Sequence, residues 1–174
     1  MKKKIVLIGM MGSGKSTIGK ILSKTLKLNF IDTDILIEKK CGLKIKEIFD
    51  KYGEKYFRDK EEKIVLNILL NDKKPCVLAL GGGAFLNKKL QKIVLKKTIS
   101  VWLDTNIELI YKRCKKSNKR PLLYENNNEK LKKIIKNLLK IRNPIYSKAK
   151  FIVKTNEQPI KVCDKILIYI KNII

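Results

Sequence analysis

The sequence predicts a single α/β domain in which five parallel strands form one sheet and helices cover both of its faces. Two observations lead to this fold class. Short apolar runs alternate along the chain with longer segments whose apolar residues recur at helical spacing, and strands separated by helices pair in parallel. The length of 174 residues, 44% of them hydrophobic, suits one packed domain and is short for two.

The expected elements follow one another from the N-terminus. The first strand, residues 4–8, is an apolar run that ends at a glycine-rich stretch, and the first helix begins directly after this stretch. The other strands are expected at residues 29–32, 76–80, 99–103 and 151–154. Helices are expected at residues 15–26, 35–39, 45–70 with a break near Gly53, 88–95, 107–114, 129–141 and 159–173. Parallel sheets bind ligands in the crevice at the carboxyl ends of their strands, so the site is expected there.

The chain is strongly basic, with 41 basic and 16 acidic residues and a net charge of +25. One interpretation is a protein that binds nucleic acid or an anionic membrane, and the other is a solvated basic surface. The excess is spread over nearly the whole chain, and all but four of the basic residues are lysine. Proteins that read nucleic acids favour arginine, so we expect no specific nucleic-acid partner.

The four arginines are informative because the chain uses lysine almost everywhere else. They are Arg58, Arg113, Arg120 and Arg142. A guanidinium offers a rigid planar fork to a carboxylate or phosphate and stays charged when it is desolvated. We therefore expect anion-binding positions, the alternative for each being retention by chance. For Arg58, on a predicted helix, a further alternative is a surface ion pair with Glu61 or Glu62.

The chain contains no histidine. This excludes Ser-His-Asp and Cys-His catalysis, so a general base must be a carboxylate, a lysine, a tyrosine or a cysteine. The four cysteines are far apart in the sequence and form no CxxC pair, which predicts free thiols in a reducing compartment. No apolar run approaches the length of a membrane span, and no cleavage site follows the basic N-terminus. We expect a cytoplasmic protein without a membrane partner.

Residues 9–16, Gly-Met-Met-Gly-Ser-Gly-Lys-Ser, match the P-loop pattern G-x-x-x-x-G-K-[ST]. They stand directly after a predicted strand and open a predicted helix, as this motif requires. The glycines let backbone N–H groups converge on phosphate oxygens, and the helix N-terminus adds its positive end. Lys15 is expected to reach the β- and γ-phosphates of ATP, and the Ser16 hydroxyl to bind Mg²⁺. The alternative, a glycine-rich turn with a chance Lys-Ser, is disfavoured by this context.

Asp32 and Asp34 stand at the carboxyl end of the second predicted strand. Residues i and i+2 of an extended chain project to the same side, so both carboxylates are expected to face the crevice. Asp32 suits a role at a nucleotide-bound Mg²⁺, and Asp34 suits accepting a proton or a hydrogen bond from a substrate hydroxyl. The alternative is that one of them only caps the following helix.

Gly81, Gly82 and Gly83 follow the third predicted strand. Three consecutive glycines give a ligand close access to the backbone, whereas a simple turn rarely needs three. Arg120 lies in a polar stretch, expected to form a mobile lid around residues 115–128. A lid arginine supplies charge to the transferring phosphoryl group and helps to exclude water.

In this order, the motifs resemble those of the shikimate kinase family. The resemblance rests on the P-loop with its trailing Thr17, Asp32-x-Asp34, Phe57-Arg58-x-x-Glu61, the Gly81–Gly83 triplet, Arg113 with Arg120-Pro121-Leu122, and Arg142-x-Pro144-x-Tyr146. It extends from residue 5 to about residue 159. Many NTPases share the P-loop, but the ordered series is far more specific.

The resemblance implies a P-loop kinase fold with a helical substrate-binding insertion around residues 35–62. It also implies ATP-dependent phosphorylation of the 3-hydroxyl of shikimate, on the pathway to aromatic amino acids. By similarity, shikimate is bound by Asp34, Arg58, Gly81, Gly82, Gly83 and Arg142; ATP by Gly12, Ser13, Gly14, Lys15, Ser16, Thr17, Arg113, Arg120 and Gln158; and Mg²⁺ by Ser16 and Asp32. Catalysis is assigned to Lys15, Asp34 and Arg120.

Two other functions remain open from the residues alone. Another small-molecule kinase of this fold, for gluconate or a nucleoside monophosphate, has the same P-loop. Asp34, Arg58 and Arg142 are the residues that discriminate: they suit a polyhydroxy carboxylic acid, which disfavours a nucleoside monophosphate. A P-loop protein that binds nucleic acid would instead use the charge of +25. We expect a monomer that acts on a small molecule with ATP and Mg²⁺, by in-line transfer governed by positioning and charge neutralisation.

Overall fold

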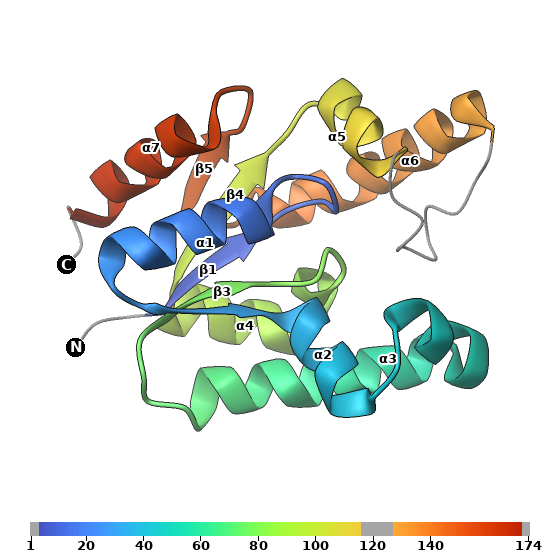
Figure 1. Cartoon of the computed structure of the whole chain (residues 1–174), viewed down its shortest axis with the longest axis horizontal. Coiled ribbons are helices and arrows are strands. Elements are labelled where there is room, and N and C mark those ends of the chain that lie inside the picture. Colours follow the sequence, from blue (N-terminus) through green and yellow to red (C-terminus); the bar gives the residue numbers. More distant parts are fainter. Residues whose placement is uncertain (1–3, 116–126, 172–174) are drawn as a thin grey trace.

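The computed structural model describes residues 4–115 and 127–171 and has an α/β architecture (Figure 1). Its sheet has five strands in the order β2-β3-β1-β4-β5, and every neighbouring pair is parallel. The strands are β1 (Ile5–Ile8), β2 (Asn29–Asp32), β3 (Cys76–Ala79), β4 (Ile99–Asp104) and β5 (Phe151–Lys154). The predicted fold class is confirmed.

Helices cover both faces of the sheet, as predicted. They are α1 (Lys15–Leu26), α2 (Thr33–Cys41), α3 (Ile45–Leu70), α4 (Lys88–Lys97), α5 (Ile107–Cys114), α6 (Asn128–Tyr146) and α7 (Pro159–Lys171), with a short 3₁₀ helix at Ala84–Leu86 that the sequence did not predict. Helices α1 and α7 lie side by side on one face, and α3 and α4 cover the other (Figure 1).

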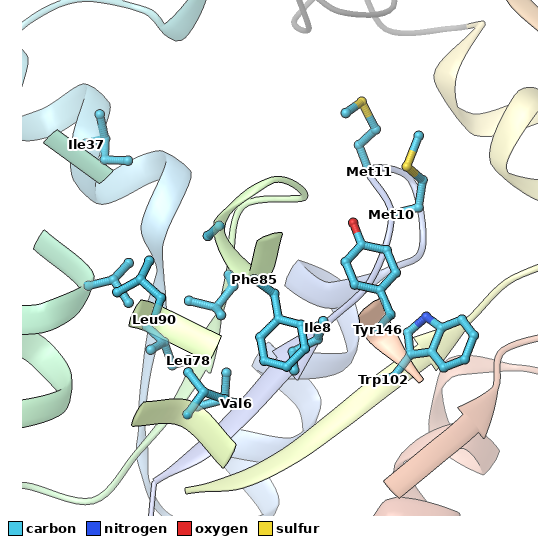
Figure 2. Packing of buried hydrophobic residues seen from close by; sticks show 14 of the residues in the cluster. Val6, Ile8, Met10, Met11, Ile37, Leu78, Phe85, Leu90, Trp102 and Tyr146 are labelled. Carbon is cyan, nitrogen blue, oxygen red and sulfur yellow. The ribbon is translucent and has the colours of Figure 1, made fainter. Parts of the chain in front are cut away.

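Strand β1 is buried on both faces. Its residues Ile5 and Leu7 pack with α1 and α7, whereas Val6 and Ile8 pack with α3, α4 and α6. Figure 2 shows part of the core on the side of Val6 and Ile8, where Ile8 lies beside Phe85. Because two cores hold this central strand, the turn that follows it starts from a rigid support.

Helix α2 begins two residues before its predicted start. The carboxylate of Asp32 accepts hydrogen bonds from the backbone N–H groups of Asp34 (3.1 Å) and Ile35 (3.5 Å), which caps the helix at Thr33. Asp32 therefore caps the helix, but it does not only cap it, because its other carboxylate oxygen accepts from the Ser16 hydroxyl.

Helix α6 ends at Tyr146 and not at residue 141, so the predicted end was wrong. Pro144 lies inside its last turn, although proline removes one helical hydrogen bond. Tyr146 is 1% exposed and packs against Trp102 (Figure 2). Its hydroxyl donates to the Gly82 carbonyl. These tertiary contacts stabilise the extra turn.

The predicted break near Gly53 is confirmed. Gly53 has φ 79° and ψ 169° inside α3, a conformation that is open essentially only to glycine. Residues 35–62, the predicted substrate-binding insertion, span most of α2 and the first part of α3 and lie outside the sheet (Figure 1). Among the helices described, each is too short or too polar to cross a membrane.

Candidate active site

The P-loop, residues 9–16, forms the turn between β1 and α1. At Gly12 the backbone has φ 80°, and an added Cβ would lie 2.9 Å from the Cys114 Sγ, so only glycine fits. The Lys15 Nζ donates hydrogen bonds to the carbonyls of Gly9 (2.8 Å) and Met10 (2.9 Å). Helix α1 has no side-chain N-cap and no acidic residue in its first turn. This arrangement leaves the positive end of the helix suited to an anion.

A cleft of about 340 Å³ lies over the P-loop. Its lining includes most of the predicted nucleotide and metal residues, namely Gly12, Ser13, Gly14, Lys15, Ser16, Thr17, Asp32 and Arg113, together with Asp34, which was predicted to bind the acceptor. At the other end the lining comes from Thr155, Glu157, Pro159 and Val162. The cleft therefore joins the loop after β1 to the loop after β5.

Ser16 and Asp32 meet at the floor of this cleft. The Ser16 hydroxyl donates to the Asp32 Oδ2 at 2.6 Å, while the Oδ1 of the same carboxylate caps α2. A hydroxyl and a carboxylate oxygen are donors that fit Mg²⁺. Within residues 4–115 and 127–171 no cluster of three or more acidic, cysteine or histidine side chains could hold a metal ion. These two donors therefore fit an ion that takes its remaining ligands from phosphate and water.

The glycine triplet packs against charged side chains. A Cβ added at Gly81 would lie 2.5 Å from the Glu61 Oε1 and 2.6 Å from the Asp34 Oδ1, so two carboxylates meet over this glycine. The Gly81 N–H donates to the buried hydroxyl of Thr33 (2.8 Å). The triplet thus forms a floor that only glycine allows.

Arg58 lies over Gly83, where an added Cβ would be 2.6 Å from its Nη1. The same Nη1 pairs with the Glu61 Oε2 at 2.7 Å, and the Nη2 pairs with the Glu54 Oε1 at 3.1 Å. Arg58 therefore forms an ion pair with Glu61, one of the two partners named in the alternative, but the predicted surface location was wrong for this pair. It is not a surface pair, because the Glu61 side chain is only 3% exposed.

Arg142 approaches the triplet from α6. It is 4% exposed, and its Nη1 donates to the Gly82 carbonyl (3.3 Å) and contacts the Met10 Sδ (3.6 Å). The same carbonyl accepts the hydroxyl of Tyr146, whose pKa burial raises above its ordinary value. Arg142 therefore connects the P-loop, the glycine triplet and α6.

The remaining predicted residues divide into three cases. The Arg113 Nη1 donates to the Gly12 carbonyl (2.9 Å), so this guanidinium lies on the P-loop. Gln158 stands just before α7, and its backbone carbonyl accepts from the Val162 N–H; its neighbours Glu157 and Pro159 line the cleft. Arg120, with most of the predicted lid, lies outside the described residues.

The family model described as "Shikimate kinase" matches residues 11–171. The chain belongs to the shikimate kinase family. The enzyme is an ATP-dependent phosphotransferase of the shikimate pathway.

Individual shikimate kinases resemble the chain over most of their length. It is 41% identical to the shikimate kinase of Zymomonas mobilis over 155 aligned residues. The alignment covers 89% of this chain and 85% of the Zymomonas protein. It is 42% identical to the shikimate kinase of Thermodesulfovibrio yellowstonii over 166 aligned residues, and this alignment covers 95% of this chain and 93% of the other. The structure of a shikimate kinase from Acinetobacter baumannii in complex with shikimate superimposes with a TM-score of 0.92 at 35% identity, covering 99% of this chain and 94% of that one.

A gluconokinase from Sinorhizobium meliloti also shares the fold. Its TM-score is 0.55 at 14% identity, and the match covers 93% of this chain and 87% of that one. At this identity the likeness concerns the fold alone. The family match therefore separates shikimate kinase from the gluconate alternative, which the P-loop could not do.

Glu61 is a charged group of the shikimate kinase site whose burial the sequence did not predict. Burial raises the pKa of its carboxyl above the ordinary value of 4.5, against the attraction of Arg58, which lowers it; the nearby Asp34 raises it further. The Glu61 Oε1 has no hydrogen-bond partner within the described part of the chain. The spacing Phe57-Arg58-x-x-Glu61 was the available signal, but burial depends on how α3 packs.

The Glu61→Gln variant is expected to become more stable relative to wild type as pH rises above about 4.5. A raised folded-state pKa means that the folded protein binds the proton more tightly than the unfolded chain does. The stabilisation that Glu61 contributes is complete below the pKa of its carboxyl in the unfolded chain. It is lost as pH rises through the pKa of the same carboxyl in the folded protein. Each unit of raised pKa corresponds to about 1.4 kcal/mol in the difference between the unfolding free energies of variant and wild type. Denaturant unfolding between pH 4 and pH 8 measures this difference.

Glu62→Gln is the matched control, because it changes the adjacent carboxylate. Its hydrogen bond from Lys89 lowers the pKa of Glu62, so the sign reverses. Between its lowered folded-state pKa and about pH 4.5, the Glu62→Gln variant should lose stability relative to wild type as pH rises, and above pH 4.5 the difference should stay constant. Equal slopes for the two variants would contradict the burial of the Glu61 charge.

Proposed function

We propose that this enzyme transfers the γ-phosphoryl group of ATP to the 3-hydroxyl of shikimate, with Asp34, Arg58 and Arg142 holding the acceptor. The observation that carries the proposal is the meeting of two guanidinium groups on the Gly81–Gly83 triplet, beside the cleft of the P-loop. Two planar forks suit a carboxylate, and a neighbouring carboxylate suits a hydroxyl. The acceptor thereby lies next to the nucleotide phosphates.

In this proposal the donor side is formed by the P-loop. Backbone N–H groups of Gly12, Ser13 and Gly14 surround the phosphates, and Lys15 neutralises the charge that develops on the transferring group. Thr17, Arg113 and Gln158 contact the rest of ATP. Arg120, in a lid around residues 115–128, adds a second cation at the phosphates.

Ser16 and Asp32 are proposed to hold Mg²⁺ together with the nucleotide. When bound, the ion neutralises phosphate charge. On the acceptor side, Asp34 accepts the hydrogen bond of the substrate hydroxyl and orients it for in-line attack. Early proton removal matters little in a loose transition state, so Asp34 acts first by positioning.

Three features of the working enzyme complete the proposal. The chain acts as one domain, residues 1–174, with residues 35–62 as the substrate-binding insertion. It acts as a monomer whose proposed site residues all belong to one chain. Its location is the cytoplasm, where ATP is available and its four cysteines remain free thiols.

The test is a coupled assay of ADP release with shikimate, gluconate and AMP compared at equal concentrations. We expect turnover with shikimate and rates near the ATPase background with the other two, because AMP has no carboxylate and gluconate is an open chain whose hydroxyls are not held at a fixed distance from its carboxylate. Omitting Mg²⁺ should abolish turnover. Turnover confined to gluconate or AMP would overturn the substrate assignment.

A further inference from the structure

Two buried threonine hydroxyls join the ends of neighbouring strands beside the cleft. Thr105 follows β4 and Thr155 follows β5, and their Oγ1 atoms lie 2.6 Å apart. The two residues are 6% and 2% exposed. A hydrogen bond this short, shielded from water, holds the two strand ends together at the carboxyl edge of the sheet.

On one side the pair reaches the P-loop. The Thr105 Oγ1 lies 3.5 Å from the carbonyl of Ser13 and 3.4 Å from that of Leu103. Each hydroxyl carries one proton, and either can donate within the pair. When Thr155 donates, the Thr105 hydroxyl donates to the Ser13 or the Leu103 carbonyl; when Thr105 donates, the Thr155 hydroxyl donates to the Asp104 carbonyl (3.4 Å). Thr105, directly after β4, thereby contacts the P-loop backbone at Ser13.

On the other side the pair reaches the far wall of the cleft. Thr155 itself lines the cleft, and Glu157 and Pro159 continue the wall to the start of α7. The Thr155 N–H also donates to the Asp104 carbonyl (2.9 Å), which anchors the backbone of this wall to β4. The hydroxyl pair is the side-chain part of the same connection.

We propose that Thr105 and Thr155 are positioning residues for ATP. Their hydroxyl pair sets the separation between the P-loop, which holds the phosphates, and residues 155–159, against which the nucleoside end rests. The inference rests on the proposed function, because it takes the nucleotide to span the cleft from one wall to the other. The hydrogen bonds described for the two hydroxyls go to each other and to the carbonyls of Ser13, Leu103 and Asp104, and not to the acceptor side at Arg58 and Arg142, so only the nucleotide should be affected.

The test replaces each threonine with valine, which keeps the shape and removes the hydroxyl. Thr105→Val and Thr155→Val are each expected to raise the KM for ATP about fivefold, the range of one lost hydrogen bond. Calorimetric titration with MgATP should show the same change in Kd, while kcat and the KM for shikimate stay within about twofold. The double variant should match the singles, because both remove one link. Thr105→Ser and Thr155→Ser should restore wild-type affinity.

Thr98→Val is the matched control. Thr98 is equally buried, and its hydroxyl donates to the Val94 carbonyl (2.7 Å) at the end of α4, away from the cleft. It should lower thermal stability without changing ATP affinity. If Thr105→Val and Thr155→Val alter the Kd of ATP no more than Thr98→Val does, or if the double variant multiplies the single effects, the inference is overturned. The titration needs no acceptor, so it decides this question even if wild type fails to phosphorylate shikimate.

Discussion

Lys15→Met is expected to lower kcat by about 10²- to 10³-fold, the loss typical of removing one preorganised charge at a transition state. The Lys15 Nζ is held by the carbonyls of Gly9 and Met10, so it is already positioned on the P-loop. Its charge counts most when negative charge develops on the transferring phosphoryl group. The Kd of ATP should therefore change much less than kcat. Single-turnover rates with shikimate and calorimetric titration with MgATP measure the two quantities.

Lys20→Met is the control for this substitution. Lys20 lies on the same helix, α1, and is exposed. The Lys20→Met substitution removes the same charge and adds the same side chain, at a position that is not among the residues lining the cleft. Its kcat should stay near wild type. A Lys15→Met enzyme within tenfold of wild-type kcat would mean that Lys15 does not act on the transferring group.

Arg58→Lys and Arg142→Lys are each expected to lower kcat/KM for shikimate by about 10- to 100-fold, the worth of a charge-assisted hydrogen bond. Lysine keeps the charge but loses the planar fork, and only the fork can pair with a carboxylate through two parallel bonds. The effect should appear as a higher KM for shikimate with little change in the KM for ATP. Steady-state kinetics with each substrate varied in turn measures both.

Arg113→Lys is the comparison for these two variants. The Arg113 guanidinium lies on the Gly12 carbonyl, on the nucleotide side. The same exchange there should raise the KM for ATP and leave the KM for shikimate unchanged. If Arg58→Lys and Arg142→Lys retain near-normal kinetics, the two guanidinium groups do not pair with the carboxylate of shikimate through parallel hydrogen bonds. Thermal unfolding of each variant shows whether the buried Arg142 also contributes to stability.

Much of the fold was predictable because its signals are local. The apolar runs of β1 and β4 and the glycine at 53 each determine their own conformation within a few residues. The end of α6 was not predictable in this way. Pro144 argues for an earlier end, and the contact of Tyr146 with the Gly82 carbonyl, 64 residues away in sequence, outweighs it.

The residues of the candidate site also differ in whether local sequence could predict them. The P-loop and the Asp32-x-Asp34 pair are short motifs, and composition alone marked the four arginines in a lysine-rich chain. The order of the motifs was enough to indicate the family that the comparisons confirm. Sequence could not show that Asp32 serves both Ser16 and the start of α2, because one carboxylate can take either role until the strand and helix are placed.

The parallel α/β fold, the P-loop and the family could all be inferred from spacing along the chain. Which charged groups are desolvated and which hydroxyls pair became known from the packing of the folded chain. The burial of Glu61 beside Arg58 and the pairing of Thr105 with Thr155 depend on elements distant in sequence packing against one another. Desolvation and hydrogen bonding act over a few ångströms of space, whatever the number of residues between the groups.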